Sequence, residues 1–258
     1  LSVLHSFPQP LVERLLELLG ASGCQAFLAQ CNEPAGAEAW VNTMKISARN
    51  LANRLNERGL DASIHDRLPD ALTLPSLTRV SQWPELKEGQ LYIMGEASQA
   101  CVQALGPTPG SRLIDLCAAP GGKTLLAARY MTGQGSILAL DIHPHKSDLL
   151  ERNSAVYGFD SMIETVAADA SVFRPALAES ADYIICDVPC SGFGIIRKKP
   201  DIRYKDLNEL EALPQLQSKI LACGGRYLKP GGVMVYSTCT VLPEENAAKL
   251  RDYLATLA

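Results

Sequence analysis

The sequence has no apolar run approaching the roughly 18 to 20 residues that a membrane-spanning helix needs, so no membrane protein is expected. It also has no excess of positive charge, since 24 Lys and Arg residues stand against 28 Asp and Glu residues, a net charge of −4. That balance argues against a uniformly basic nucleic-acid-binding surface. With 47% hydrophobic and 20% charged residues and no internal repeat, the 258 residues predict one or two globular domains.

The eight cysteines include no C-x-x-C pair, so a structural zinc site is not expected. They are too sparse for a disulfide scaffold, and no secretory signal precedes them. We therefore expect reduced thiols in a cytoplasmic protein without a metal. His143 and His145 are likewise assigned to a solvated turn rather than to a metal site.

Residues 1–88 predict a small α+β domain without a catalytic motif. The periodicity and end signals predict helices over residues 8–20, 25–32 and 47–58, a strand over 39–42, and short extended segments near 62–65 and 72–74.

Residues 89–258 predict a second domain, in which short apolar runs alternate with helix-length segments. This alternation is typical of an α/β fold with a parallel sheet covered by helices. The five runs occupy residues 112–116, 136–141, 163–168, 182–187 and 232–237. Four of them end in residues suited to binding or catalysis, at the sheet edge where ligands bind in such folds.

A dense glycine-containing turn follows the first run, after Asp115. It consists of Cys117, Ala118, Ala119, Pro120, Gly121, Gly122 and Lys123, and leads into a helix at Thr124. A P-loop reads G-x-x-x-x-G-K-[ST], and the end of the turn fits that pattern. However, Cys117 stands where the first glycine belongs, and Pro120 lacks an amide for a phosphate cradle.

The other ligand that fits this edge is a nucleoside held through its ribose. Asp141 ends the second run, 26 residues after Asp115, where an acidic residue accepts hydrogen bonds from ribose hydroxyls. Asp169 follows the third run and suits an adenine amino group, and Asp187 ends the fourth. Three carboxylates repel a triphosphate but tolerate the cationic sulfonium of S-adenosylmethionine, which we predict as the cofactor.

Two cysteines follow the last two runs: Cys190 in an Asp-Val-Pro-Cys sequence and Cys239 in Ser-Thr-Cys. A single cysteine at such a place is usually a packing residue. Two thiols beside a methyl donor suit methylation at carbon 5 of a pyrimidine. One thiolate adds to carbon 6 and activates carbon 5, and a second group helps to remove the carbon 5 proton.

These motifs resemble those of the RNA cytosine-C5 methyltransferases of the Sun/nucleolar-protein family. The segment 190–203 and Leu242-Pro-Glu-Glu-Asn246 are most similar to the bacterial branch that acts on small-subunit (16S) ribosomal RNA. The resemblance implies a Rossmann-like class I methyltransferase sheet preceded by a small RNA-binding-type α+β domain. It implies that Cys239 is the nucleophile and that Cys190 serves proton removal and product release. The cofactor residues that it implies are Cys117 through Lys123, Asp141, Asp169 and Asp187.

The expected RNA contact is the segment 197–205, which has five basic residues and one acidic residue. Its candidate phosphate-binding residues are Arg197, Lys198, Lys199 and Arg203. Members of this branch usually carry a helical RNA-binding domain before the position of Leu1 and a strand pair after a helix like that over 243–257, so we expect either a fragment or a shortened member. A catalytically impaired RNA-binding fragment therefore stands as one alternative hypothesis. A P-loop NTPase, indicated by the end of the glycine turn, stands as the other.

Overall fold

The computed structural model describes residues 1–75 and 77–256, which divide into two compact units. The sheet unit comprises Gly36–Asp187 and Ala222–Tyr236, and the helical unit comprises Leu1–Ala35, Val188–Leu221 and Ser237–Ala258. The chain passes from one unit to the other at residues 35–36, 187–188, 221–222 and 236–237, so both units are built from segments distant in sequence.

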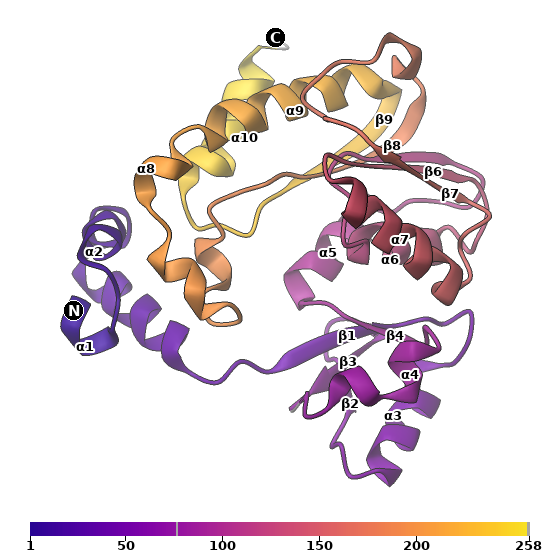
Figure 1. Cartoon of the computed structure of the whole chain (residues 1–258), viewed down its shortest axis with the longest axis horizontal. Coiled ribbons are helices and arrows are strands. Elements are labelled where there is room, and N and C mark those ends of the chain that lie inside the picture. The colour runs from indigo at the N-terminus through magenta and orange to yellow at the C-terminus, as the bar shows by residue number, and fades with distance from the viewer. Residues whose placement is uncertain (76, 257–258) are drawn as a thin grey trace. The chain divides into compact units, whose positions relative to one another are not determined.

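All five predicted strands form one five-stranded sheet in the order β7-β6-β5-β8-β9 (Figure 1). Their bounds are Arg112–Asp115 (β5), Ser136–Asp141 (β6), Ile163–Ala167 (β7), Ala181–Asp187 (β8) and Leu228–Ser237 (β9). Strand β5 pairs in parallel with β6 and β8, with Ile114 opposite both Leu138 and Ile184, and β6 pairs in parallel with β7. Ile114 and Ile184 are fully buried, as expected for strands covered on both faces. The predicted α/β class is therefore confirmed, although β9 begins four residues earlier than expected.

Three helices pack against the first strands of this sheet. They are α5 (Glu96–Leu105), α6 (Gly122–Tyr130) and α7 (Pro144–Tyr157). Helix α6 contacts β6, α7 contacts β6 and β7, and α5 contacts α6 and β8. A further 3₁₀ turn, η2 (Pro175–Leu177), precedes β8. Leu113, Leu125 and Ile137 are completely or almost completely buried in one hydrophobic cluster. Because Leu113 precedes the glycine turn and Leu125 follows it, both ends of the turn are anchored in this core.

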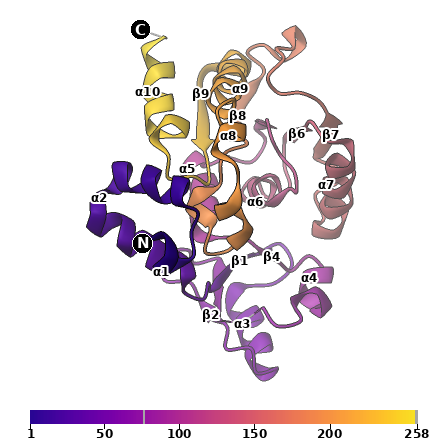
Figure 2. The same ribbon diagram turned by 60° about the vertical axis from the view of Figure 1, so that its left-hand side comes forward.

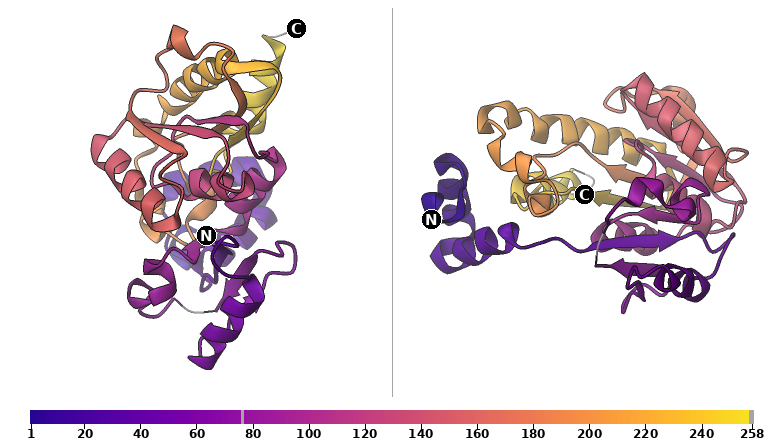
Figure 3. Two further views of the ribbon diagram at one scale, coloured as in Figure 1. Left: turned by 90° about the vertical axis from the view of Figure 1, so that its right-hand side faces the viewer. Right: turned by 60° about the horizontal axis from the view of Figure 1, so that its bottom comes forward.

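A smaller four-stranded antiparallel sheet lies in the same unit, in the order β2-β3-β1-β4 (Figures 1 and 3). Its elements are β1 (Ala37–Val41), α3 (Ala48–Glu57), β2 (Ser63–Ile64), β3 (Ala71–Leu74), η1 (Val80–Gln82), α4 (Pro84–Lys87) and β4 (Leu91–Ile93). The Ser47 side chain accepts a hydrogen bond from the Asn50 amide and caps α3, as its sequence predicted. Trp40 of β1 stacks on Tyr92 of β4 with ring centroids 5.8 Å apart, and both contact Tyr157 of α7.

The helical unit begins with α1 (Ser2–His5) and α2 (Gln9–Asn32). Two separate helices were predicted for residues 8–20 and 25–32, whereas the second helix follows the first directly. Gly20 has a φ of 69° at the junction, and Figure 2 shows the resulting bend in α2. The rest of the unit holds η3 (Phe193–Ile195), η4 (Pro200–Tyr204), α8 (Leu207–Leu210), the first part of α9 (Leu213–Tyr227), η5 (Pro243–Glu245) and α10 (Ala247–Ala255).

The core of the helical unit joins its three chain segments. Leu11, Leu15 and Leu28 of α2 pack in one cluster with Phe193 and Leu242. Phe193 follows the Cys190 loop and Leu242 follows the Cys239 loop, so this cluster anchors both. Among the described residues, no helix combines the length and apolarity needed to cross a membrane.

Candidate active site

The glycine turn starts from a buried carboxyl group at the end of β5. Asp115 is 1% exposed, and Oδ2 accepts a hydrogen bond of 2.7 Å from the Thr124 hydroxyl. Burial raises the pKa of Asp115 to about 7, and the neighbouring Asp187 carboxylate acts in the same direction. This hydrogen bond ties the last residue of the strand to the first turn of α6 and sets the path of the turn between them.

Gly121 and Gly122 are required by close contacts at the start of α6. Gly121 has a φ of 108°, and a Cβ there would overlap Cδ1 of Leu150. A Cβ on Gly122 would lie 3.0 Å from the Tyr92 ring. The first-turn amides of α6 have no acceptor within the helix, so the turn presents backbone donors at the carboxyl edge of the sheet.

The turn does not provide the groups that a P-loop uses. Lys123 Nζ lies 2.6 Å from Oδ2 of Asp187, so its charge is already neutralised by a strand-end carboxylate. The Thr124 side chain is completely buried and donates to Asp115 instead of being available to a metal ion. The lysine and threonine that fitted the P-loop pattern thus have structural partners, which removes the basis of the NTPase alternative.

The predicted carboxylates do gather at the carboxyl edge of the sheet. Asp141 ends β6 and accepts hydrogen bonds from the amides of Ala119, at 3.3 Å, and His143, at 2.9 Å. Asp169 follows β7 and is exposed, and Asp187 ends β8. Ala118 is buried, whereas Ala119 is half-buried and Pro120 is exposed.

Cys117 is half-buried at this carboxylate-rich edge. Its pKa is raised well above that of a free thiol, mainly by burial and then by the charges of nearby carboxylates, Asp115 first and Asp141 next. Cys117 therefore remains a neutral thiol in the turn and is not a candidate nucleophile.

The two predicted catalytic cysteines lie side by side in the helical unit. The Sγ atoms of Cys190 and Cys239 are 3.1 Å apart, and the Cys239 amide donates a hydrogen bond of 3.2 Å to Sγ of Cys190. Cys239 is exposed and Cys190 is half-buried. Because β8 and β9 are neighbours, the loops that follow them bring together two thiols 49 residues apart.

The proximity of the two thiols changes their acidity. The pKa of the Cys190 thiol lies well above its ordinary value, first because of the hydrogen bond to Cys239 and then because of burial. Two adjacent thiolates would repel each other, so the pair carries at most one negative charge near neutral pH. This arrangement suits one nucleophilic thiolate and one thiol that retains its proton.

The comparisons with known proteins agree with these features. A family model described as 16S rRNA methyltransferase RsmB/F matches residues 102–258, more than half of the chain. The chain belongs to this family. A second model, the ferredoxin-like domain of RsmF/B-like methyltransferases, matches residues 7–81. The resemblance inferred from the sequence motifs is thereby confirmed.

Individual relatives of the RsmB/F family extend beyond the region matched here. The ribosomal RNA small subunit methyltransferase B of Cronobacter sakazakii is 35% identical over 90% of this chain and 54% of its own length. A probable methyltransferase of the same name from Synechocystis sp. is 31% identical over 97% of this chain and 56% of its own length. This chain thus spans about half the length of these relatives.

A solved structure supports the same fold. A methyltransferase homologue from Pyrococcus horikoshii is 27% identical, with a TM-score of 0.85 over 98% of this chain and 80% of that one. The predicted sheet preceded by a small α+β region is therefore confirmed.

The basic segment of this RsmB/F family member divides into two groups. Arg203 is 7% exposed, lies with its guanidinium 4.1 Å from the Phe7 ring centroid, and bonds to Asn32 Oδ1 at 3.0 Å. Arg197 is exposed, but its guanidinium donates to the carbonyls of Glu33 and Pro34. Both arginines therefore hold the basic segment against α2 and the residues after it.

Lys198 and Lys199, like Arg197, are exposed. Arg203 was predicted to bind RNA phosphates from its charge alone, and its partners Phe7 and Asn32 lie far away in the sequence. No local signal could have revealed that it is buried.

Two residues of the thiol site were missed at the sequence level, Glu245 and Gln217. Both are buried, and both bond to the loops that carry the thiols. Glu245 belongs to the Pro-Glu-Glu-Asn segment that carried part of the family resemblance, which was its only sequence signal.

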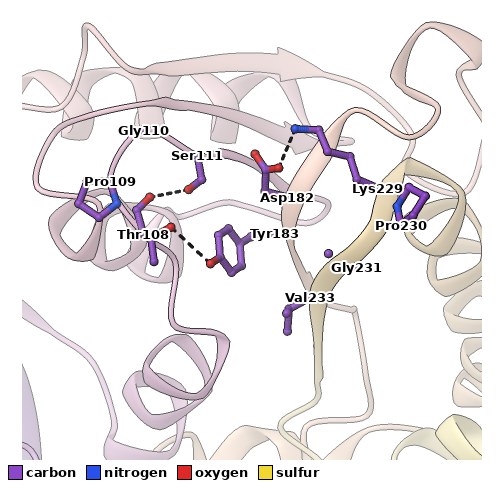
Figure 4. Close-up of a pocket in the computed structure, with 11 residues that line it drawn as sticks. Thr108, Pro109, Gly110, Ser111, Asp182, Tyr183, Lys229, Pro230, Gly231 and Val233 are labelled. Atoms are coloured by element: carbon purple, nitrogen blue, oxygen red, sulfur yellow. Dashed lines mark hydrogen bonds and ion pairs between the residues drawn. The ribbon is translucent and has the colours of Figure 1, made fainter.

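A pocket of 470 Å³ lies at the opposite, amino-terminal edge of the sheet, near the starts of β5, β8 and β9 (Figure 4). Its polar groups bind one another: Lys229 Nζ lies 2.6 Å from Asp182, and the hydroxyls of Thr108 and Tyr183 are 3.4 Å apart. It contains none of the predicted site residues. Within residues 1–75 and 77–256, no cluster of three His, Cys, Asp or Glu side chains is arranged to hold a metal ion.

Proposed function

We propose that this chain transfers a methyl group from S-adenosylmethionine to carbon 5 of a cytosine in RNA, with 16S ribosomal RNA as the substrate. The observation that carries the proposal is the approach of the Cys190 and Cys239 Sγ atoms to 3.1 Å in a chain of the RsmB/F family. A methyltransferase acting on oxygen or nitrogen would need no such pair of thiols.

The roles of the two thiols follow from their surroundings. Cys239 is the exposed thiol and is assigned as the nucleophile that adds to carbon 6 of the cytosine. Addition converts carbon 5 into an enamine-type nucleophile that accepts the methyl group. Cys190 keeps its proton while Cys239 attacks. After methyl transfer Cys190 releases that proton to solvent, and its thiolate accepts the proton from carbon 5. The electron pair of the carbon 5–hydrogen bond re-forms the ring double bond as the bond from carbon 6 to Cys239 breaks, which restores the Cys239 thiolate.

The donor set at the sheet edge fits S-adenosylmethionine. Carboxylates at or just after the ends of β6, β7 and β8 suit hydrogen bonds from ribose hydroxyls and amino groups, with Asp141 buried, Asp169 exposed and Asp187 half-buried. The glycine turn supplies backbone donors. When bound, this cofactor supplies a methyl group on a positively charged sulfonium. The proposed cofactor residues are Cys117, Ala118, Ala119, Pro120, Gly121, Gly122, Lys123, Asp141, Asp169 and Asp187.

Lys198 and Lys199 are proposed to contact RNA phosphates, whereas Arg197 and Arg203 support the loop that presents them. A target cytosine must be unstacked before two thiols can reach it, so a loop or flipped nucleotide is the expected substrate. The small domain over residues 1–88 is proposed to add RNA-binding surface, and residues 89–258 to form the catalytic domain. Such a protein acts in the cytoplasm.

The direct test is to incubate the chain with small-subunit RNA and S-adenosylmethionine and then to map 5-methylcytosine in the product. A single modified position that depends on Cys239 would support the proposal. Equilibrium binding of S-adenosylhomocysteine and ATP gives an independent test, because a preference for ATP would contradict the cofactor assignment. Cofactor binding without methyl transfer would instead favour the impaired RNA-binding fragment.

A further inference from the structure

We propose that Glu245 is a positioning residue, which holds the loops carrying Cys190 and Cys239 so that the two thiols remain in contact. The proposal deepens the function above and rests on it for its catalytic meaning. The contacts themselves all lie in the helical unit and involve no cofactor or RNA.

Glu245 is a buried carboxylate with partners on the opposite loop. It is 2% exposed, and its Oε2 accepts a hydrogen bond of 2.9 Å from the backbone amide of Ser191, the residue directly after Cys190. Glu245 itself lies on the second loop, six residues after Cys239. One carboxylate oxygen therefore connects the two thiol-bearing loops.

Gln217 of α9 extends the connection to the other side of Cys190. Its Nε2 donates to the same Glu245 oxygen at 2.8 Å and to the carbonyl of Pro189 at 3.0 Å. Pro189 directly precedes Cys190, so the Glu245–Gln217 pair holds the backbone on both sides of this cysteine. Gln217 is completely buried, which excludes solvent from these bonds.

Other contacts between the loops explain why Glu245 is needed as well. The hydroxyls of Ser191 and Thr240 are 2.6 Å apart, and the Gly194 amide donates to the Cys239 carbonyl at 2.9 Å. The Val188 amide also donates to the Ser237 carbonyl at 3.2 Å. These bonds join the two loops at other residues than Pro189, whose carbonyl accepts from Gln217. The Glu245–Gln217 pair therefore adds a buried connection at the residue directly before Cys190.

The test measures how close the thiols are without using the methylation reaction. The full chain is equilibrated with oxidised and reduced glutathione, and the Cys190–Cys239 disulfide is quantified by peptide mass spectrometry. Protein dithiol and oxidised glutathione give protein disulfide and two reduced glutathione molecules. The equilibrium constant therefore reports the effective concentration of one thiol at the other.

Glu245→Leu removes both acceptor bonds and should lower this constant by about tenfold or more, since small misplacements of reacting groups have large effects. Glu245→Gln keeps an oxygen that can accept both bonds and should stay within about threefold of wild type. Glu244→Gln is the matched control, because Glu244 is partly exposed and pairs with Arg14 on the surface. It should leave the constant unchanged.

A folded Glu245→Leu chain with the wild-type constant would overturn the proposal. Gln217→Leu is the second variant if Glu245→Leu does not fold. It frees the Pro189 carbonyl but leaves the Glu245–Ser191 bond, so a smaller decrease is expected, and no decrease would overturn the proposal. If the glutathione series behaves as expected but wild type does not methylate RNA, then the proposed function fails and the positioning role stands.

Discussion

The glycine turn and the thiol pair are built in opposite ways. The turn is a continuous segment from Asp115 to Thr124, held by one side-chain bond between its ends and by close backbone contacts at Gly121 and Gly122. The thiol pair joins residues 49 positions apart and depends on the side chains of Glu245, Gln217, Ser191 and Thr240.

The contrast between a continuous turn and a long-range pair corresponds to two different tasks, cofactor recognition and covalent chemistry. A cofactor with many polar groups is recognised by backbone amides and strand-end carboxylates, which a short motif supplies. Covalent chemistry on a base needs two sulfur atoms in contact, and only long-range packing can provide that contact. Substitutions in the turn should therefore act on folding and cofactor binding, and substitutions around the thiols should act on chemistry.

The largest expected effect comes from removing the thiols themselves. Cys239→Ala should reduce methyl transfer by about 10³-fold or more and form no covalent RNA adduct, because the nucleophile is lost. Cys190→Ala should also lose turnover but accumulate the adduct, since the final elimination is blocked. Denaturing electrophoresis with labelled RNA measures both. Cys101→Ala in α5 is the control, and the reverse adduct pattern would exchange the two roles.

Gly121→Ala should damage the turn without affecting the thiol pair. The positive φ and the contact of the new Cβ with Leu150 should together lower the free energy of unfolding by about 3 kcal/mol. Gly158→Ala has a similar positive φ but no atom within 4 Å of the added Cβ, so it should lose only about 1 kcal/mol. Denaturant titration compares them, and equal losses would contradict the steric argument.

The buried carboxyl group of the turn should make the free energy of unfolding depend on pH between about pH 4 and pH 7. Asp115 has a pKa of about 7 in the fold, above the value of about 3.9 in an unfolded chain. Between these values only the unfolded chain loses the proton, so the stabilising contribution of this group is lost as pH rises from about 4 to about 7. The slope is at most about 1.4 kcal/mol per pH unit.

Asp115→Asn does not titrate and keeps an oxygen for the Thr124 hydroxyl. Its free energy of unfolding should therefore rise relative to wild type from pH 4 to pH 7 and then remain level. Chemical denaturation at a series of pH values measures this difference. A constant difference across the window would show that Asp115 is ionised in the fold.

The smallest effect is expected at the exposed basic segment. Lys199→Gln should weaken RNA binding a few-fold and lower the slope of log Kd against log salt by about 1, because one phosphate contact is lost. Lys87→Gln on α4 removes the same charge from a different exposed position and serves as the control. Equal losses in the two variants would mean that the effect comes from net charge alone.

Much of this architecture was predictable because its signals are local. The five strand positions followed from short apolar runs, and the α3 cap followed from Ser47. The helices before and after Gly20 were predicted less well. Two helices were predicted with a gap over residues 21–24, whereas the second helix begins directly after Gly20. The burial of Arg203 was not predictable, because Phe7 and Asn32, against which it lies, are more than 170 residues away in the chain.

The sequence by itself determined the order of strands and helices, the carboxylates at the strand ends and the two cysteine motifs, because each depends on neighbouring residues. Tertiary structure alone decided that the two thiols touch, that Lys123 pairs with Asp187, and that Glu245 lies between the loops. These contacts depend on which strands become neighbours in the sheet and on how the following loops pack. No short stretch of sequence encodes that information.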